Sequence, residues 1–216
     1  MTPTPLIQVL RTHLSEVWIF IWIYSAAALF GYLVGAINPA SIIARVRGMD
    51  LRLSGSGNPG ATNAGRVMGW RIGVLVGFLD VLKGYLPVVM VNYVAGDGPA
   101  RVAGVMAVVG HITSPYLRGR GGKGVATAMG AILAVRPLWA LPVLLIFGIV
   151  VVLTRNVGLA SVCGALGLIP AALVFRYDYV DLIFAVVLSG LICIRHSKNL
   201  STIGRALRLR EGIPPS

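Results

Sequence analysis

The sequence predicts an all-α integral membrane protein with about seven transmembrane helices. Three observations carry this prediction: an apolar composition, apolar runs of membrane-spanning length, and basic residues that gather on alternate connections between those runs. Of the 216 residues, 56% are apolar and 12% are charged, and the mean hydropathy is +0.83. A soluble domain carries about 25% charged and about 45–50% apolar residues, so this composition argues against a soluble protein.

Five apolar runs are expected to cross the membrane, for which a helix needs roughly 20 residues. They cover residues 17–44, 72–94, 138–153, 157–175 and 182–194, and Asn38-Pro39 interrupts the first run near its end. Two shorter runs, 102–109 and 125–135, flank a loop rich in glycine and arginine. Counted as two crossings they give seven in all, and counted as one re-entrant hairpin they give five. Both counts are odd, so the termini are expected on opposite sides.

The distribution of charge gives the orientation. The formal net charge is +12, from 19 basic and 7 acidic residues. Most of the basic residues fall in the connections 45–71, 118–123 and 154–156 and in the tail after residue 194, whereas the opposite connections hold Arg101, Arg136 and Arg176. Because cytoplasmic connections carry the excess of Lys and Arg, we expect the N-terminus outside and the C-terminus in the cytoplasm. The positive charge therefore reflects topology, and no nucleic-acid partner is predicted.

Neither a metal nor a cofactor is predicted. Cys163 and Cys193 lie within apolar runs, where free cysteine behaves as a small hydrophobe, and no Cys/His grouping has the spacing of a zinc site. The few carboxylates do not form the acidic cluster of a metal-dependent alcohol phosphotransferase. Asp80 and Lys83 lie one turn apart within a span, which favours a structural ion pair. His111 is expected to support the glycine-rich loop that follows it.

Three polar segments on the predicted cytoplasmic side, residues 54–66, 118–124 and 195–199, carry the candidate chemistry. In the first, glycines let backbone N–H groups turn toward an anion, and hydroxyl, amide and guanidinium groups complete a phosphate cradle. Its candidate residues are Ser56, Asn58, Thr62, Asn63 and Arg66. The alternative is a flexible connector. The first two segments match G-x-G-x-x-G, but neither follows a predicted strand, which argues against a dinucleotide-binding fold.

The second segment places several backbone amides and the ammonium of Lys123 at the start of the helix expected over 125–135. A helix N-terminus favours anions through its free N–H groups and its dipole. The alternative is that Arg118, Arg120 and Lys123 only set the topology.

The third segment contains His196 and Asn199, which are three residues apart and share a helical face. A histidine titrates near neutrality and can move a proton; the alternative is an interfacial histidine. Beyond this segment, Leu200, Ile203 and Leu207 recur at helical spacing. That pattern fits either a short helix on an anionic leaflet or a solvated basic tail.

Together, Ser56-Gly-Asn-Pro-Gly-Ala-Thr-Asn63 with Arg66, Gly121-Gly-Lys-Gly-Val-Ala-Thr127, and Arg195-His-x-x-Asn199 closely resemble the three motifs of the bacterial PlsY family of acyl-phosphate:glycerol-3-phosphate acyltransferases. The resemblance covers roughly residues 29–212. It implies seven helices and the same orientation of the termini. The implied reaction transfers a fatty acyl group from acyl phosphate to the 1-hydroxyl of glycerol 3-phosphate. Its products are inorganic phosphate and lysophosphatidic acid, the first intermediate of membrane phospholipid synthesis.

The resemblance also implies a role for each motif residue. Catalytic roles fall to Ser56, Arg66, Lys123 and His196, and substrate binding falls to Asn58, Thr62, Asn63, Gly121, Gly122 and Asn199. Lys123 and the amides of Gly121 and Gly122 would hold the phosphate of one substrate. The general base is either His196 or a phosphate oxygen of the substrate.

The resemblance further implies how the chain is divided and where it works. An N-terminal extension covers residues 1–16, a transmembrane acyltransferase domain covers 17–195, and a basic cytoplasmic tail that completes the third motif covers 196–216. The site is expected to face the cytoplasm from the bacterial cytoplasmic (inner) membrane. Membrane lipid surrounds it, and a soluble phosphate acyltransferase supplies the acyl phosphate.

Two other functions remain as alternatives. A transporter of phosphate or of a phosphorylated metabolite tends to place its site near the membrane midplane and to contain internal repeats, whereas this chain gathers its polar segments on one face and shows no obvious repeat. A lipid-binding scaffold accounts for the basic face but not for Asn58, Thr62 and Asn63.

Overall fold

The computed structural model describes residues 5–175 and 178–210, and the side chains within 15–175 and 178–197. Throughout these ranges the chain forms helices and loops and no β-strand, which confirms the all-α prediction. The α-helices are α1 Pro5–Ala36, α2 Pro39–Val46, α3 Ala61–Met68, α4 Trp70–Ala95, α5 Asp97–Ile112, α6 Val125–Val135, α7 Ala140–Thr154, α8 Val157–Val174 and α9 Tyr179–Arg210. Two short 3-10 helices are η1 Pro115–Leu117 and η2 Pro137–Trp139.

Five segments of the described chain are long and apolar enough to cross a membrane. They are Ser15–Val46, Trp70–Ala95, Pro137–Thr154, Val157–Val174 and Tyr179–Ser197, and they coincide with the five long apolar runs of the sequence. The two shorter runs lie in α5, of 16 residues, and α6, of 11 residues. At 1.5 Å per residue these helices are about 24 Å and about 16 Å long, whereas the hydrocarbon core is roughly 30 Å thick.

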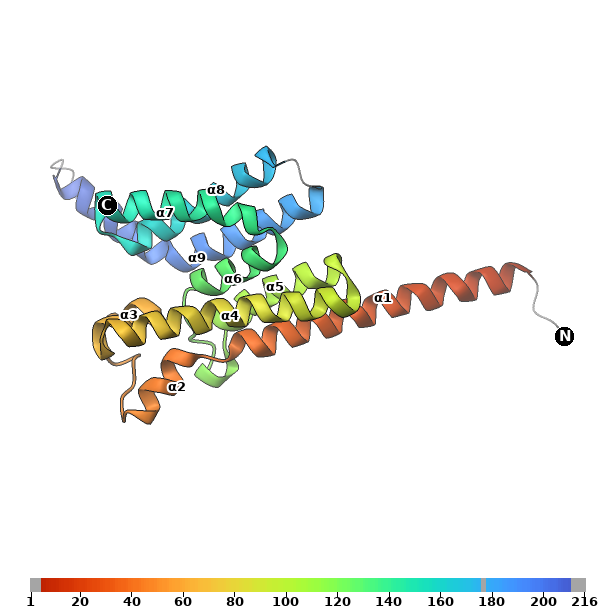
Figure 1. Ribbon diagram of the computed structural model, residues 1–216, viewed down its shortest axis with the longest axis horizontal. Helices are drawn as coiled ribbons and strands as arrows, with labels where there is room; N and C mark the ends of the chain where they lie inside the picture. The colour runs from red at the N-terminus through yellow and green to blue at the C-terminus, as the bar shows by residue number, and fades with distance from the viewer. Residues whose placement is uncertain (1–4, 176–177, 211–216) are drawn as a thin grey trace.

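The predicted interruption at Asn38-Pro39 is confirmed. α1 ends at Ala36, and α2 starts at Pro39 and runs in a different direction (Figure 1). Proline lacks the N–H that would continue a helix and restricts the residue before it, so the chain turns here. The Asn38 side chain then caps α2, because its Oδ1 accepts a hydrogen bond of 2.8 Å from the Ser41 N–H.

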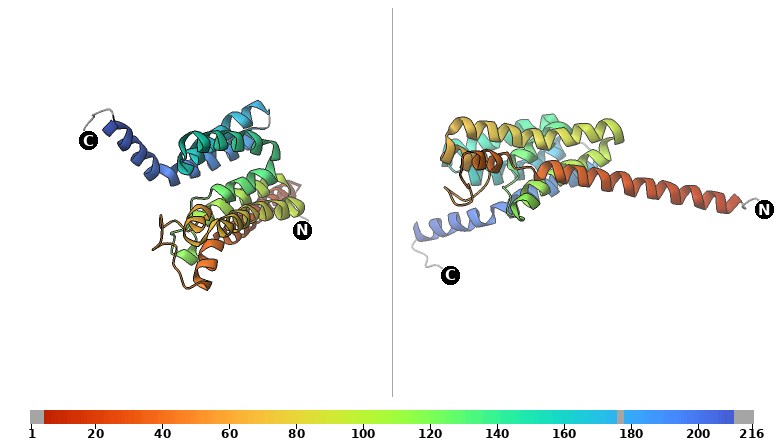
Figure 2. Two further views of the ribbon diagram at one scale, coloured as in Figure 1. Left: turned by 60° about the vertical axis from the view of Figure 1, so that its left-hand side comes forward. Right: turned by 90° about the horizontal axis from the view of Figure 1, so that it is seen from below.

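No helix boundary separates residues 16 and 17, where the sequence divides the N-terminal extension from the transmembrane domain. α1 runs continuously from Pro5, and its N-terminal half extends alone beyond the neighbouring helices (Figure 2). Its apolar side chains from Val17 to Tyr24, including Trp18 and Trp22, are exposed. In an integral membrane protein, such a surface is suited to contact lipid.

The helices form two groups (Figures 1 and 2). In the first group α1, α4, α5 and α6 pack together, with α3 against α4, and in the second α7, α8 and α9 pack together. Within the first group the backbones approach closely at glycines: a Cβ added to Gly35 would collide with the backbone of Ala107, and one added to Gly84 with the backbone of Thr127. Small residues at helix interfaces are typical of membrane proteins, because association there depends on close packing.

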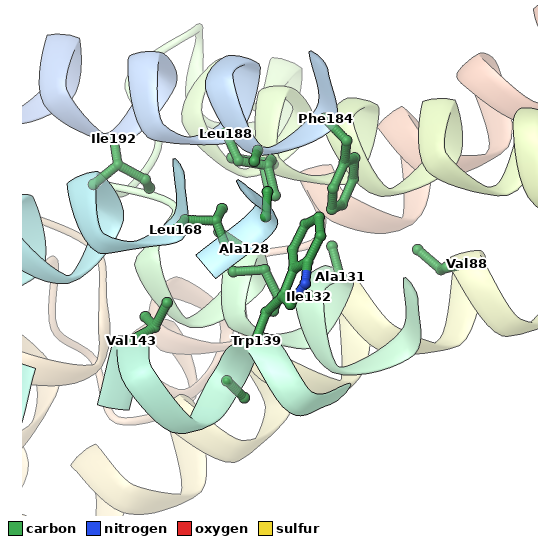
Figure 3. Close-up of a cluster of buried hydrophobic side chains, with 14 of the residues drawn as sticks. Val88, Ala128, Ala131, Ile132, Trp139, Val143, Leu168, Phe184, Leu188 and Ile192 are labelled. Carbon is green, nitrogen blue, oxygen red and sulfur yellow. The ribbon is translucent and has the colours of Figure 1, made fainter. Parts of the chain in front are cut away.

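A buried apolar cluster joins the two groups. Figure 3 shows the fully buried Trp139 directed toward Ile132 of α6 and Phe184 of α9, with Leu168 of α8 and Leu188 of α9 beside them. η2 and α6 therefore serve as the connection on which the second group of helices packs against the first.

An ion-pair cluster joins the same groups at the end of the molecule opposite the glycine-rich loops. The fully buried carboxylate of Asp181 accepts 2.8 Å hydrogen bonds from the Nε groups of Arg101 and Arg136. Asp97 accepts a further bond of 3.2 Å from Arg101. These residues come from α5, the end of α6 and the start of α9, so the connections predicted to share one side of the membrane do lie together.

Candidate active site

A cavity of about 710 Å³ lies between the two groups of helices. One part of its wall is polar and contains residues of all three predicted segments, and the rest is apolar. The polar lining residues are Ser56, Asn58, Thr62, Asn63, Arg66, Asp80, His111, Lys123, Arg155, Asn156, Ser161, Ser189 and His196. The lining residues with the largest apolar side chains come from α6 to α9: Met129, Ile132, Leu144, Phe147, Leu168, Leu188 and Ile192. The cavity thus joins a polar, cationic part at the three predicted segments, here called its mouth, to an apolar part between α6 and α9, here called its interior.

The side-chain amide of Asn63 holds the first glycine-rich loop, residues 54–60, through hydrogen bonds to its backbone. The Asn63 side chain is buried; its Oδ1 accepts a 2.8 Å hydrogen bond from the Ser56 N–H, and its Nδ2 donates to the carbonyls of Ser54 and Leu51 at 3.0 and 3.2 Å. Gly55 has a φ of +60°, and a Cβ there would collide with the Asn63 amide. Asn63, predicted to bind substrate, therefore has its amide engaged with the loop in this structure.

The remaining candidates of this segment surround the start of α3. Ser56 and Asn58 precede it in the loop, and Thr62 and Arg66 lie one turn apart on the helix with exposed side chains. α3 begins after Gly60 without a side-chain cap, so its first N–H groups stay available to an anion. The structure therefore brings these four predicted residues together at the cavity.

The second loop differs from its prediction in one respect. The N–H groups of Gly121 and Gly122 donate to the carbonyls of Ile112 and His111 at 3.0 and 3.1 Å, so these amides bind the end of α5 and are not directed at a ligand. Neither glycine lines the cavity. Both lie so close to His111 that any Cβ would collide with it. The two glycines thus allow close packing against α5. Their amides are expected from the sequence to contact a phosphate, but in this structure both amides donate to α5 carbonyls.

The residues of this segment that line the cavity come directly after the two glycines. Gly124, with a φ of +82°, turns the chain into α6, and Gly124, Val125 and Ala126 line the cavity. The N–H groups of Val125 and Ala126 precede the Ala128 N–H, which donates to the Gly124 carbonyl at 2.8 Å. A helix therefore starts where the sequence predicts it, with Gly124 and, before it, Lys123 leading into its first residue.

The third segment brings His196 to the cavity and binds the second loop. His196 is buried, and its Nδ1 lies 2.8 Å from the Ile192 carbonyl. A carbonyl only accepts, so Nδ1 carries the proton and Nε2 of the neutral ring is an acceptor. Arg195 donates to the carbonyls of Gly121 and Gly122 at 3.2 and 3.3 Å. The side chain of Asn199 and the apolar stripe beyond it lie outside the described side chains.

The charge at the mouth of the cavity is predominantly positive. Burial lowers the pKa of Lys123 below its usual range, and the nearby guanidinium groups of Arg195 and Arg66 lower it further. Arg155 adds another cation, and Asp80 is the only carboxylate among the described residues that line the cavity. An anion with two negative charges, such as a phosphate monoester, complements this mouth.

Two expectations about the surroundings of the loops are confirmed. Asp80 and Lys83 form a buried ion pair of 2.9 Å, and His111 supports the second loop through its carbonyl. Sequence reasoning assigned Arg155 to topology and did not place it, or Asn156, at the cavity. An asparagine directly before a predicted span is a sequence signal for a helix cap. Asn156 does cap α8, because its side chain accepts a 3.0 Å hydrogen bond from the Leu159 N–H. This cap fixes the turn that holds Arg155.

Within the described side chains, no group of three or more His, Cys, Asp or Glu residues converges in a way that could hold a metal ion.

The chain is similar in sequence to known acyltransferases. The glycerol-3-phosphate acyltransferase family model matches residues 25–206. The chain is 38% identical over 177 residues to the glycerol-3-phosphate acyltransferase of Thermoanaerobacter sp. (strain X514), with 82% of this chain and 89% of the relative covered. It is 37% identical over 187 residues to that of Staphylococcus aureus (strain Newman), with 82% and 92% covered.

Two solved structures share the fold. The crystal structure of PlsY (YgiH), an integral membrane glycerol 3-phosphate acyltransferase, in its glycerol 3-phosphate form superposes with a TM-score of 0.79 and 37% identity, covering 88% of this chain and 92% of that one. The lysophosphatidic acid form gives a TM-score of 0.78 and 36% identity, with the same coverage.

Proposed function

Because the chain belongs to the glycerol-3-phosphate acyltransferase family, we propose that it transfers a fatty acyl group from acyl phosphate to the 1-hydroxyl of glycerol 3-phosphate. The products are lysophosphatidic acid and inorganic phosphate. The observation that carries this proposal is that one cavity has both a cationic mouth and an apolar interior. One substrate is a small phosphate monoester and the other is a phosphate joined to a fatty chain, so each part of the cavity has a matching part of a substrate.

The residues of the mouth suit the binding of phosphate. Lys123 and Arg66 supply charge, and the first N–H groups of α6 and α3 supply directed donors. Ser56, Asn58 and Thr62 supply hydroxyl and amide groups for the glycerol hydroxyls and the acyl carbonyl. The fatty chain occupies the interior between α7 and α8, where Leu144, Phe147 and Leu168 line the cavity.

Because acyl phosphate is already an activated acyl donor, the enzyme mainly has to position the two substrates. The 1-hydroxyl oxygen attacks the acyl carbonyl carbon, a C–O ester bond forms, the C–O bond to phosphate breaks, and the hydroxyl proton leaves. Phosphate is a good leaving group, so no covalent acyl-enzyme is required. Lys123 and Arg66 neutralise the charge that develops on the phosphate, and the cavity holds the reacting groups in register. The proton goes to Nε2 of His196 or to a phosphate oxygen of the substrate.

The membrane arrangement follows from the same proposal. α5 and α6 are shorter than the hydrocarbon core is thick, and each completes a crossing together with the loop residues at its ends. With the five long crossings this gives seven, with the N-terminus outside and the C-terminus inside. The clustering of Arg101, Arg136 and Asp181 at the end opposite the loops supports this sidedness. The site then opens to the cytoplasm from the bacterial cytoplasmic membrane, where a soluble phosphate acyltransferase supplies acyl phosphate. Residues 17–195 form the transmembrane domain, and residues 196–216 complete the third motif with Asn199.

The test is an assay of purified protein in lipid or detergent with palmitoyl phosphate and glycerol 3-phosphate. We expect release of inorganic phosphate that depends on both substrates, and lysophosphatidic acid detected by mass spectrometry. Palmitoyl coenzyme A in place of palmitoyl phosphate distinguishes the donor. Folded protein that releases no phosphate and uses neither donor would overturn the proposal, and transport of glycerol 3-phosphate into vesicles would then be measured.

A further inference from the structure

We propose that Asp80 is a positioning residue that holds the first and second glycine-rich loops at the cavity simultaneously; the kinetic part of its test rests on the proposed acyl transfer. Asp80 lies within the span formed by α4 and is 2% exposed. Its Oδ1 lies 2.9 Å from the Lys83 ammonium and 3.5 Å from Nδ1 of His111. Charged groups inside a membrane span are costly and mark functional positions.

One set of contacts leads from Asp80 to the first loop. The Lys83 ammonium, held by Asp80, also donates a 2.6 Å hydrogen bond to the Ile37 carbonyl at the joint between α1 and α2. The next residue, Asn38, is buried and donates from Nδ2 to the Pro59 carbonyl at 2.9 Å. Pro59 precedes Gly60, after which α3 begins, so the position of this ion pair determines where the first loop meets the cavity.

A second set of contacts leads from Asp80 to the second loop. His111, which is 4% exposed, presents Nδ1 to Asp80 and places Nε2 against Gly122, where a Cβ would collide with the ring. The His111 carbonyl accepts the Gly122 N–H at 3.1 Å. Lys123 follows directly, so the orientation of the imidazole sets the position of the ammonium that faces the phosphate.

Stability alone does not account for this ion pair. Replacement of a buried ion pair by apolar groups of similar volume is often neutral or stabilising. The buried cluster of Arg101, Arg136 and Asp181 at the opposite end provides the internal comparison, because none of its members lines the cavity. Both clusters join helices, but only the Asp80 cluster contacts the two loops.

The experiment compares two variants that each remove one buried pair without leaving net charge. The test variant is Asp80→Asn with Lys83→Met, and the matched control is Asp181→Asn with Arg101→Met. For each, kcat and KM are measured for both substrates, and hydrogen exchange is followed in peptides that cover residues 54–63 and 118–124. We expect the test variant to lose about a hundredfold in kcat/KM, the order of loss that a misplacement of about 1 Å produces. Exchange in both loops should rise at least about tenfold, while the control shows neither change.

A folded test variant with wild-type kinetics, or with unchanged exchange in both loops, overturns the inference. If the double variant fails to fold, Asp80→Glu is measured in the same way, because it keeps the charge and displaces the carboxylate by one methylene. It should lose activity and loop protection, and wild-type values for both would equally overturn the inference. If wild-type protein shows no acyl transfer, the proposed function fails, whereas the exchange comparison still decides the role of Asp80.

Discussion

Replacement of Lys123 with alanine is expected to lower kcat/KM for glycerol 3-phosphate by about 10- to 150-fold. The Lys123 ammonium is half-buried at the cavity mouth, beside Arg66 and Arg195. A hydrogen bond to a charged group contributes about 1.5–3 kcal/mol, and each 1.36 kcal/mol is a tenfold change in rate. The loss is bounded because the two guanidinium groups continue to attract the phosphate.

The measurement is release of inorganic phosphate at varied glycerol 3-phosphate with saturating palmitoyl phosphate. The matched control is Arg120→Ala, which removes one positive charge from the same segment at an exposed residue that does not line the cavity. If the role of Lys123 is only to set topology, the two variants should behave alike. Equal kcat/KM values for both, in protein of equal thermal stability, would refute the assignment of the phosphate site.

Three further outcomes follow from the same geometry. Because the pKa of Lys123 is lowered by burial and by two nearby guanidinium groups, the ammonium loses its proton at a lower pH than an ordinary lysine near 10.4; the pH–rate profile should decline correspondingly early, and Lys123→Arg should move that decline to higher pH. Gly122→Ala should reduce turnover by about a hundredfold, because its Cβ collides with the His111 ring; unchanged turnover would contradict this packing. Asn63→Ala removes three hydrogen bonds, so the free energy of unfolding should fall by about 1.5–4.5 kcal/mol; an unchanged denaturation midpoint would show that Asn63 does not hold the loop.

The parts of the fold that depend on local pattern could be predicted from the sequence. The five long helices follow from apolar runs, since only helices and closed barrels satisfy the backbone within lipid. The break before Pro39 follows from the missing N–H of proline. The pairing of Asp80 with Lys83 follows from their spacing of one helical turn, and the structure confirms it.

The parts of the site that depend on tertiary packing could not be predicted in this way. The Gly121 and Gly122 amides donate to α5, a contact between segments whose relative position the sequence leaves open. Asn63 directs its amide back toward the first loop, and Arg155 reaches the cavity because α8 packs on α7 and α9. In each case the residue type indicated a polar role, but the packing of helices distant in sequence decides where the amide or side chain points.

The location of the cavity follows from what a membrane permits at helix ends. Inside lipid every backbone N–H must be satisfied, and a helix leaves its first N–H groups unpaired. α3, α6 and α8 all begin at the cavity mouth, after Gly60, Gly124 and Asn156. Under the proposed function, a phosphate satisfies the first N–H groups of α3 and α6 from the aqueous side, whereas at the start of α8 the side chain of Asn156 caps the Leu159 N–H. Apolar residues of α6 and α8 continue into the interior of the cavity. An enzyme that joins a soluble phosphate monoester to a fatty chain needs a cationic surface and an apolar surface close enough for the two substrates to react. Helices that begin in the site provide both surfaces.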